Sequence, residues 1–484
     1  MRLRRVYPSF GDIRRVWGSI GIRTHLFTRK RRTFVILLLL QLSAERSSAL
    51  HSPIRHLIFP SPSNNPTPLH PPSNSHPPPK MSASTMRAWV YTQSGLPSQT
   101  LRPTTTFPAP TPSSLGPTDL LIEVDYVSLN AICTTMMRAL PPQPFSLGLP
   151  FRRRIAVPEF EFSGRILATG SQVPATRPEL TPTARVAGCV SEQEVFGTGK
   201  GALAERLIAP ASQVIALTSC PLPLQPSPSA QSPSQPETPP APAPQPEPLS
   251  PLEASGLTAC GCTAMQTLSL TGLIAGDKLL VNGGSTSVGM LTIQIARHIL
   301  GATGTIVATC SSRNAALVGS LGVDEVIDYV AHDPLHEHLR AHHSSSSSSA
   351  AAKTRPFDAI IDCVGDATLY RHCAAYLAEG KPFINLGQMN AAPGFWGQLA
   401  WAWEQVALRF WPVVFGGAPR GYRFYSGRPR AEDMGRVLRL VERGVVRVVV
   451  DSVWGWGEVP QAYERMESKR ARGKVVVRVR GEDA

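Results

Sequence analysis

The sequence lacks any obvious membrane-spanning segment and any disulfide framework. Its two most apolar stretches, residues 34–42 and 395–417, both fall short of about twenty uninterrupted apolar residues, the length that a spanning helix needs. The eight cysteines show no disulfide-like spacing and no pair of C-x-x-C units. These absences argue against an integral membrane protein, and they predict a reducing compartment and no structural zinc.

Acidic residues are scarce mainly at the N-terminus. Residues 1–80 hold thirteen Lys and Arg against two acids, and they carry most of the net charge of +14. The remainder is nearly neutral, which disfavours a nucleic-acid groove. The stretch "RKRRTFVILLLLQLSAERSSA" is either a signal or transit sequence, or it precedes a true start at Met81. We expect residues 1–80 to be a disordered or targeting extension outside the fold. We expect the protein to be intracellular, mitochondrial if the transit sequence is genuine and otherwise cytoplasmic.

The rest of the sequence changes from strand signals to alternating strands and helices. Short strand patterns such as "DLLIEVDYVSLN" follow Met86 and suit a barrel-like β domain. A Pro-rich insert at 218–251 blocks both helix and sheet. Beyond it, strands alternate with helical stretches, which predicts a parallel sheet with crossover helices. The expected strands are "KLLVNGG", "GTIVATCSS", "DEVIDYV", "FDAIIDCVG" and "KPFINLG", and a Ser-rich insert at 341–355 interrupts this order without disturbing it.

A glycine-rich loop stands between the first of these strands and an apolar helical pattern, in "LLVNGGSTSVGMLTIQIARHIL". Amides at a helix N-terminus favour an anion, and glycines let a pyrophosphate approach the backbone. The pattern therefore predicts dinucleotide binding, with a purely structural turn as the alternative. The predicted pyrophosphate residues are Gly283, Gly284, Ser285, Thr286, Ser287, Val288 and Gly289.

The end of the second strand indicates which dinucleotide is bound. An NAD site usually has an acid there, whereas this stretch reads "VATCSSRN". The hydroxyls of Ser311 and Ser312 and the guanidinium of Arg313 suit a 2′-phosphate, which favours NADPH. A solvated arginine on a loop is the alternative.

With these residues the chain resembles the medium-chain dehydrogenase/reductase superfamily, in particular the zinc-free quinone oxidoreductases and the mitochondrial reticulon-interacting oxidoreductases. The marks are "VSLNAIC", "PEFEFSG", "GALAERLIAP", "VNGGSTSVGMLTIQIAR", "SLGVDEVIDY", "FDAIIDCVG" and "RARGKVVVRV". The resemblance implies an α/β fold in which a GroES-like β-barrel catalytic domain accompanies a Rossmann-type, doubly wound parallel sheet. The implied boundaries are 84–252 for the catalytic domain, 253–393 for the NADPH-binding domain, and 394–484 for an apolar helix and a return to the catalytic domain.

The resemblance also implies further site residues. Tyr329 is expected on the adenosine side, and Asn130 near the reacting centre, although a turn-stabilising asparagine is an equal alternative. The zinc-binding positions of relatives are occupied here by Asn130 and Glu159-Phe160-Glu161, which are poor zinc ligands or none, so no metal is expected. Glu159 replaces the usual glycine, and Ala131 and Cys133 replace a proline and an aspartate. The expected nicotinamide residues are Cys363, Val364, Gly365, Leu386 and Gly387.

The expected activity is transfer of a hydride from NADPH to a quinone or to an α,β-unsaturated carbonyl, as in an enoyl reductase. The alternative is a catalytically weak regulatory or scaffold protein of the same fold. The expected partners are a small-molecule substrate and a second copy in a homodimer. Nucleic acid is not expected as a partner. Residues 395–417 hold four of the eight tryptophans. Core or interface packing is the first interpretation of that segment, and peripheral membrane contact is the second.

Overall fold

The computed structural model describes residues 84–139, 155–217, 249–344, 355–387, 392, 394–415 and 417–480. The N-terminal extension and most of both inserts lie outside these residues. The strands are β1 (Thr85–Val90), β2 (Arg102–Pro108), β3 (Asp119–Ser128), β4 (Glu161–Thr169), β5 (Arg185–Cys189), β6 (Arg206–Pro210), β7 (Val214–Ala216), β8 (Lys278–Asn282), β9 (Thr305–Cys310), β10 (Glu325–Asp328), β11 (Ala359–Asp362), β12 (Pro382–Asn385), β13 (Gly421–Phe424), β14 (Val450–Trp454) and β15 (Lys474–Arg478).

Helices connect most of the later strands. They are α3 (Pro97–Thr100), α4 (Ala131–Ala139), α5 (Val173–Thr176), α6 (Pro251–Ala254), α7 (Thr258–Thr271), α8 (Ser287–Leu300), α9 (Ala315–Gly319), α10 (Leu335–His342), α11 (Ala367–Arg371), α12 (Phe395–Phe410), α13 (Ala431–Glu442) and α14 (Val459–Glu467). Short 3-10 turns adjoin several of these helices, and further 3-10 turns and one π turn connect strands in the described residues.

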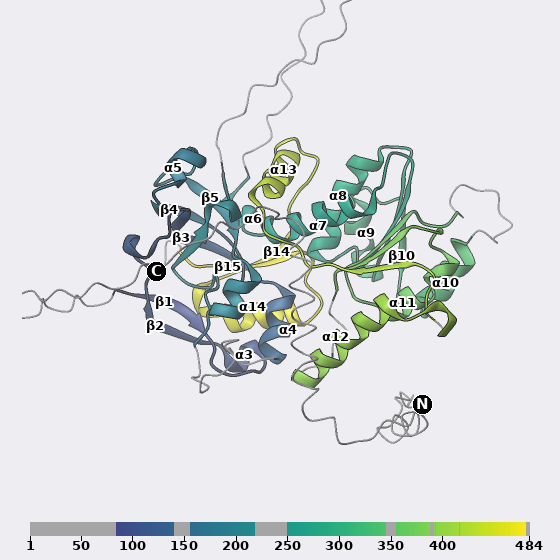
Figure 1. The fold of residues 1–484 in the computed structure, drawn as a ribbon, viewed down its shortest axis with the longest axis horizontal. Coiled ribbons are helices and arrows are strands. Elements are labelled where there is room, and N and C mark those ends of the chain that lie inside the picture. Colours follow the sequence, from purple (N-terminus) through teal and green to yellow (C-terminus); the bar gives the residue numbers. More distant parts are fainter. Residues whose placement is uncertain are drawn as a thin grey trace, which may run out of the picture. The chain divides into compact units, whose positions relative to one another are not determined.

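The first half of the described chain builds an antiparallel sheet that the C-terminal strands complete. Its order is β14-β15-β3-β4-β5-β7, with β6 paired to β3, and β14 and β15 are parallel to each other. β15, drawn in yellow, lies beside β3, drawn in blue (Figure 1). β1 and β2 form a separate ribbon that a bridge from Ala88 to Ala204 ties to the loop before β6. Strands from the first half and from the C-terminal part of the described chain therefore meet in one sheet.

The second sheet is parallel throughout, with the order β10-β9-β8-β11-β12-β13. This order is that of a Rossmann fold, and ligands bind such sheets beyond the carboxyl ends of the strands. The predicted alternation of strands and helices is confirmed. β13 is a sixth strand that the sequence patterns did not indicate, because its four residues, "GYRF", follow a run of Pro and Gly. The domain boundaries at 252/253 and 393/394 stay predictions.

Candidate functional site

The predicted cofactor residues lie where the parallel strands end. Gly283 follows β8, Ser311 follows β9, Tyr329 follows β10, Cys363 follows β11 and Leu386 follows β12. Because the carboxyl ends of parallel strands meet at one edge of a sheet, the fold gathers five separate segments there. The candidate site is this edge together with the N-terminus of α8.

The loop between β8 and α8 is closed by its own hydrogen bonds. The amide of Gly283 donates to Thr309 Oγ1 (2.9 Å), and the amide of Gly284 donates to the Thr309 carbonyl (2.8 Å). Thr286 caps α8: its hydroxyl donates to the carbonyl of Gly283 (2.8 Å) and accepts from the amide of Gly289 (3.0 Å). Because the Thr286 amide also bonds to Gly283, four loop amides are used within the fold.

Two of the glycines are required by close approach. Gly283 has a φ of +82°, and a Cβ there would lie 2.8 Å from Val364 Cγ2. A Cβ on Gly289 would lie 2.3 Å from the carbonyl oxygen of Gly283. Neither position accommodates a side chain, so strand, loop and helix pack as closely as a dinucleotide-binding turn needs.

Three amides at the start of α8 remain for a ligand. Among the described residues, the amides of Ser285, Ser287 and Val288 donate to no acceptor. α8 is 14 residues long, so these amides lie at the positive end of a helix dipole. The side chain of Thr286 is turned back onto the loop as the cap, and Ser285, Ser287 and Val288 are partly exposed. The arrangement fits the predicted pyrophosphate site and narrows its direct donors to three.

The residues predicted for the adenosine side lie together at the ends of β9 and β10. Arg313 Nε donates to Ser311 Oγ (3.2 Å). The amide of Ser312 donates to the carboxylate of Asp328 (3.1 Å), and the amide of Tyr329 donates to the last carbonyl of β9 (3.3 Å). Asp328 was missed by the sequence analysis, since it belongs to the next strand rather than to the expected acidic position.

The carboxylate of Asp328 is stabilised by the backbone. The amide of Val330, and then that of Ser312, hold the pKa of Asp328 below its usual value. Arg313, which follows Ser312 in the chain, is exposed. This edge of the sheet therefore carries one cation, Arg313, and one carboxylate, Asp328, that already accepts hydrogen bonds from two backbone amides.

A buried polar network holds the loop after β11. Asp362 is 1% exposed, and it accepts hydrogen bonds from the amides of residues 364–366 (2.6–3.0 Å) and from Asn282 Nδ2 (2.8 Å). Asn282 in turn accepts from Thr309 Oγ1 (2.6 Å). Burial raises the pKa of Asp362 against these bonds. Burial, and then the charge of Asp362, raise the pKa of Cys363 to about 12, so this thiol is protonated near neutral pH.

The segments after β11 and β12 touch each other. The amide of Leu386 donates to the Asp362 carbonyl (2.8 Å), and that of Gly387 donates to Asn385 Oδ1 (2.8 Å). A Cβ on Gly387 would lie 2.1 Å from the carbonyl carbon of Val364. The predicted nicotinamide residues are therefore adjacent. The sequence signal for Asn282, Asp362 and Asn385 was that each is a polar residue at the end of an apolar strand.

Asn130, the predicted catalytic residue, is fixed by internal bonds in the turn after β3. Its Nδ2 donates to the Ser128 carbonyl (2.9 Å) and to Glu159 Oε2 (3.3 Å), and its backbone amide donates to the same Oε2 (3.0 Å). Its Oδ1 accepts from Lys474 Nζ (3.2 Å). These bonds are those of a turn-stabilising asparagine, and a direct role at the reacting centre stays a prediction.

Glu161 and Lys474 form a buried ion pair beside Asn130. The other oxygen of Glu161 accepts from the amides of Ala259 (2.6 Å) and Cys260 (3.2 Å), in the first turn of α7. Burial acts to lower the pKa of the Lys474 ammonium, but Cys260 and Glu161 outweigh it and raise that pKa. The pair thereby joins the antiparallel sheet to α7.

The donor set around Asn130 does not fit a zinc ion. The ammonium of Lys474 already neutralises Glu161, and the amide hydrogens of Asn130 are directed to other acceptors. Burial, and then Glu159, raise the pKa of the Cys133 thiol well above its usual value. Within the described part of the chain, no group of three or more His, Cys, Asp or Glu is arranged to hold a metal.

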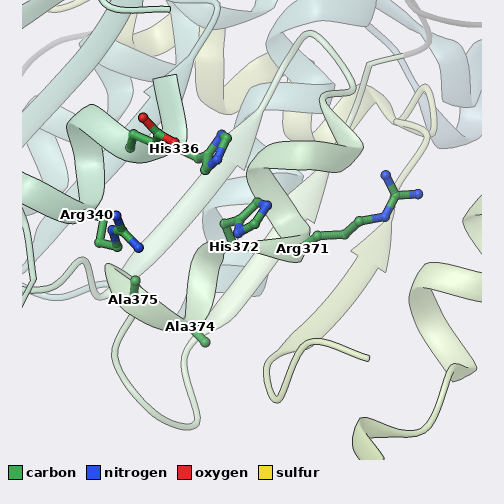
Figure 2. Close-up of a pocket in the computed structure, with 7 residues that line it drawn as sticks. His336, Arg340, Arg371, His372, Ala374 and Ala375 are labelled. Atoms are coloured by element: carbon green, nitrogen blue, oxygen red, sulfur yellow. The ribbon is translucent and has the colours of Figure 1, made fainter. Parts of the chain in front are cut away.

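A cavity of about 340 Å³ lies elsewhere, between α10 and α11. Figure 2 shows the imidazoles of His336 and His372 beside each other, with ring centroids 4.1 Å apart. Arg371 extends away from them and pairs with Glu404 of α12 (2.8 Å). None of the predicted site residues lines this cavity.

The apolar segment 395–417 forms α12 and a short 3-10 turn. One side packs inward, where Trp401 meets Phe424 edge to face at 5.1 Å. Trp396 and Trp403 are 71% and 55% exposed. The interpretation of this segment as core packing therefore applies to the side of α12 that holds Trp401. None of the helices in the described residues has the length and apolar character that crossing a bilayer requires.

Comparison with known proteins yields a family match and a similar full-length relative. The family model described as "Zinc-binding dehydrogenase" matches residues 321–477. The chain is 57% identical over 403 residues to the trans-enoyl reductase PoxH of Penicillium oxalicum, which covers 83% of this chain and 100% of the relative.

Solved structures share the fold at lower identity. A quinone oxidoreductase from Coxiella burnetii has a TM-score of 0.57 and 22% identity, covering 82% of this chain and 100% of its own. A mycobacterial protein solved in complex with NADPH has a TM-score of 0.55 and 19% identity, covering 81% and 99%. These likenesses confirm the expected combination of a GroES-like domain with a Rossmann-type sheet.

Proposed function

Since the chain belongs to the medium-chain dehydrogenase/reductase superfamily and is an oxidoreductase, we propose that it is a zinc-independent, NADPH-dependent reductase of α,β-unsaturated carbonyl compounds. One observation carries the proposal: the amides of Ser285, Ser287 and Val288 at the start of α8 have no acceptor among the described residues. The relative named a trans-enoyl reductase supports the choice of substrate class. Quinones are the second class, which the structural similarity to a quinone oxidoreductase supports.

When bound, NADPH supplies the hydride that adds to the β-carbon of the unsaturated carbonyl, while a proton reaches the α-carbon. The chain's own residues bind and orient. The three amides at the start of α8 would hold the pyrophosphate, and the segments 363–365 and 386–387 would lie on the nicotinamide side. Asp362 fixes both segments, because its side chain accepts from the amides of residues 364–366 and its carbonyl accepts from the amide of Leu386.

Coenzyme choice rests on the ends of β9 and β10. Arg313 provides the positive charge that a 2′-phosphate needs, and Ser311 and Ser312 provide hydroxyls. The nearby Asp328 would repel a phosphate, but amides from Ser312 and Val330 already stabilise its charge. We therefore expect NADPH to bind more tightly than NADH.

Zinc independence is part of the proposal because Lys474 already supplies the positive charge that pairs with Glu161. A carbonyl substrate would then be polarised by hydrogen-bond donors rather than by a Lewis acid. Prolonged treatment with a strong chelator should leave the activity unchanged. Loss of activity that added Zn²⁺ restores would contradict this part.

The test combines turnover with coenzyme binding. Purified full-length protein should oxidise NADPH when an α,β-unsaturated thioester or ketone is present, and more slowly with quinones. In the binding experiment, 2′,5′-ADP should compete with NADPH for the protein and 5′-AMP should not. Arg313→Ala should weaken NADPH binding about tenfold, as loss of one charge-assisted contact predicts, and should leave NADH binding unchanged.

Two outcomes would reject the proposal. Tight NADPH binding without oxidation across the whole panel would favour the regulatory or scaffold alternative, which the similarity to a named reductase does not favour. If 2′,5′-ADP and 5′-AMP compete with NADPH equally well, the assignment of Arg313 to the 2′-phosphate is rejected. A small-molecule substrate is the expected partner, while homodimer formation, membrane contact through 395–417 and the cellular location stay predictions.

A further inference from the structure

Glu159 combines a left-handed backbone with a fully buried carboxyl group. Its φ is +73°, and its exposed fraction is 0%. Among the described residues, Thr183 and Lys469 are the other non-glycine positions with positive φ, and both are exposed. L-residues avoid this region for steric reasons, and a buried carboxyl is costly as well. A residue that carries both costs points to a role, since such strain concentrates at functional positions.

Three neighbouring segments hold this carboxyl. Tyr463 of α14 donates its hydroxyl to Oε1 (2.5 Å). Asn130 donates both its backbone amide (3.0 Å) and its Nδ2 (3.3 Å) to Oε2. The thiol of Cys133 in α4 also hydrogen-bonds to Glu159. One oxygen of Glu159 therefore sets both the backbone and the side chain of the Asn130 turn.

The ionisable groups that face Glu159 come from several elements. They are Tyr463, Cys133, Lys474 of β15 and Tyr91 at the bridge after β1. Burial raises the pKa of Glu159 to about 7, against the bonds from Tyr463, Asn130 and Cys133 and the charge of Lys474. Burial raises the pKa of Tyr91, Cys133 and Tyr463 too, so these three remain protonated donors or neutral neighbours.

The turn that Glu159 holds is linked to the cofactor edge. Asn130 Oδ1 accepts from Lys474, and Lys474 is paired with Glu161 at the first turn of α7. Lys474 and Ser287, the first residue of α8, line the same small cavity. Lys474 therefore lies between the Asn130 turn and the start of α8.

We propose that Glu159 is a positioning residue: its carboxylate locks the Asn130 turn, and protonation of that carboxyl releases the turn. A protonated carboxyl accepts the two Asn130 bonds less strongly, because its negative charge is gone and one of its oxygens has become a donor. The inference rests on the proposed function, because it deepens the account of the same reductase site.

The first test is the pH profile of kcat and KM for NADPH-dependent reduction between pH 5.5 and 8.5. The wild-type chain should show an inflection near neutral pH that changes kcat at least threefold. Glu159→Gln keeps an acceptor but does not titrate, and Glu159→Gly restores the residue that suits this φ. Both variants should lose the inflection. An unchanged inflection in Glu159→Gln would overturn the proposal.

Glu467→Gln is the matched control. Burial also raises the pKa of Glu467, which lies one turn beyond Tyr463 on α14 and pairs with Arg138. This variant should keep the wild-type pH profile. If it removes the inflection as Glu159→Gln does, the effect is a general one of charge on α14, and the proposal fails.

A second readout does not depend on turnover. In protein labelled with ¹⁵N only at asparagine, the Asn130 side-chain amide is assigned by its loss in Asn130→Ser. Its resonances should shift between pH 5.5 and 8.5 in the wild type and stay fixed in Glu159→Gln. Absence of a shift in the wild type would overturn the positioning role even if the enzyme is active. A shift without any NADPH oxidation would support that role and reject the proposed reductase activity.

Discussion

Two buried carboxylates in this protein are stabilised in different ways. Asp362, at the edge of the parallel sheet, is surrounded by the amides of residues 364–366 and by the Asn282 side chain. Glu161, in the antiparallel sheet, is paired with the ammonium of Lys474 and also meets two amides of α7. Neutral donors satisfy the first carboxylate, whereas a buried countercharge is the main partner of the second.

The difference shows what each group organises. Backbone donors converge on Asp362 from one short loop, so the carboxylate fixes the shape of that loop. Glu161 and Lys474 are 313 positions apart in sequence, so their pair fixes the contact between distant segments. A buried ion pair is costly to desolvate, and it fails when one partner is removed. We therefore expect mutations at the pair to act on folding, and mutations at Asp362 to act on the ligand edge.

The largest effect is expected from Lys474→Met, which leaves Glu161 buried without its countercharge. Unfolding free energy from urea titration should fall by about 3–5 kcal/mol. The double variant Glu161→Gln with Lys474→Met should recover at least half of that loss, because no charge is then left unpaired. A loss below about 1 kcal/mol in the single variant would remove the distinction between the two networks.

Glu159 extends the comparison to pH. Its pKa is raised from 4.5 to about 7, so the folded chain keeps a proton that the unfolded chain loses. Unfolding free energy should therefore fall as pH rises from about 4.5 to about 7, by about 3 kcal/mol from this group alone. The difference between the wild type and Glu159→Gln, measured by urea unfolding across that range, isolates this contribution. A constant difference would contradict the assignment.

Asp362→Asn should have a smaller effect on stability and a clear effect on binding. The new amide group faces backbone donors, so at least one of the bonds to residues 364–366 is lost. The expected cost is about 1–3 kcal/mol of unfolding free energy, with a weaker affinity for NADPH in fluorescence titration. Asp366→Asn is the control, because asparagine caps a helix as well as aspartate and should leave both measurements unchanged.

Thr286→Ala is expected to have the smallest effect, near 1 kcal/mol of unfolding free energy, because it removes the cap of α8. NADPH affinity should fall severalfold, since the amide of Gly289 loses its acceptor and the loop is less ordered. Thr286→Ser keeps the hydroxyl and should resemble the wild type. An equal loss in both variants would show that the methyl group matters rather than the cap.

Local sequence patterns were enough to predict most strands of the parallel sheet. The strands β8 to β12 are apolar runs with crossover helices between several of them, and such runs can be recognised without any long-range information. β2 and β13 were missed because "RPTTTFP" and "GYRF" contain proline or glycine, which also mark turns, and hold no run of apolar residues. Edge strands of this kind are specified by their neighbours rather than by their own sequence.

Local patterns alone predicted only the contiguous parts of the candidate site, and the family resemblance supplied the scattered residues. The glycine loop and the "CSSR" stretch can each be recognised from a short segment of the sequence. Asn282, Thr309 and Asp362 act together although they lie 27 to 80 positions apart, and no local pattern reports such a contact. The sequence shows that Glu159 stands where relatives have glycine. Its left-handed backbone and its hydrogen bonds to Asn130 are visible only in the folded structure.

The pairing of β15 with β3 also bears on how the chain matures on the ribosome. The ladder partners of residues 126–128 lie at 476–478 and leave the exit tunnel some 350 residues later. During that interval all the strands of the parallel sheet, which end at Phe424, have already been synthesised. The nascent protein therefore carries an open strand edge, of the kind that pairs with unintended neighbours, until β15 has been synthesised.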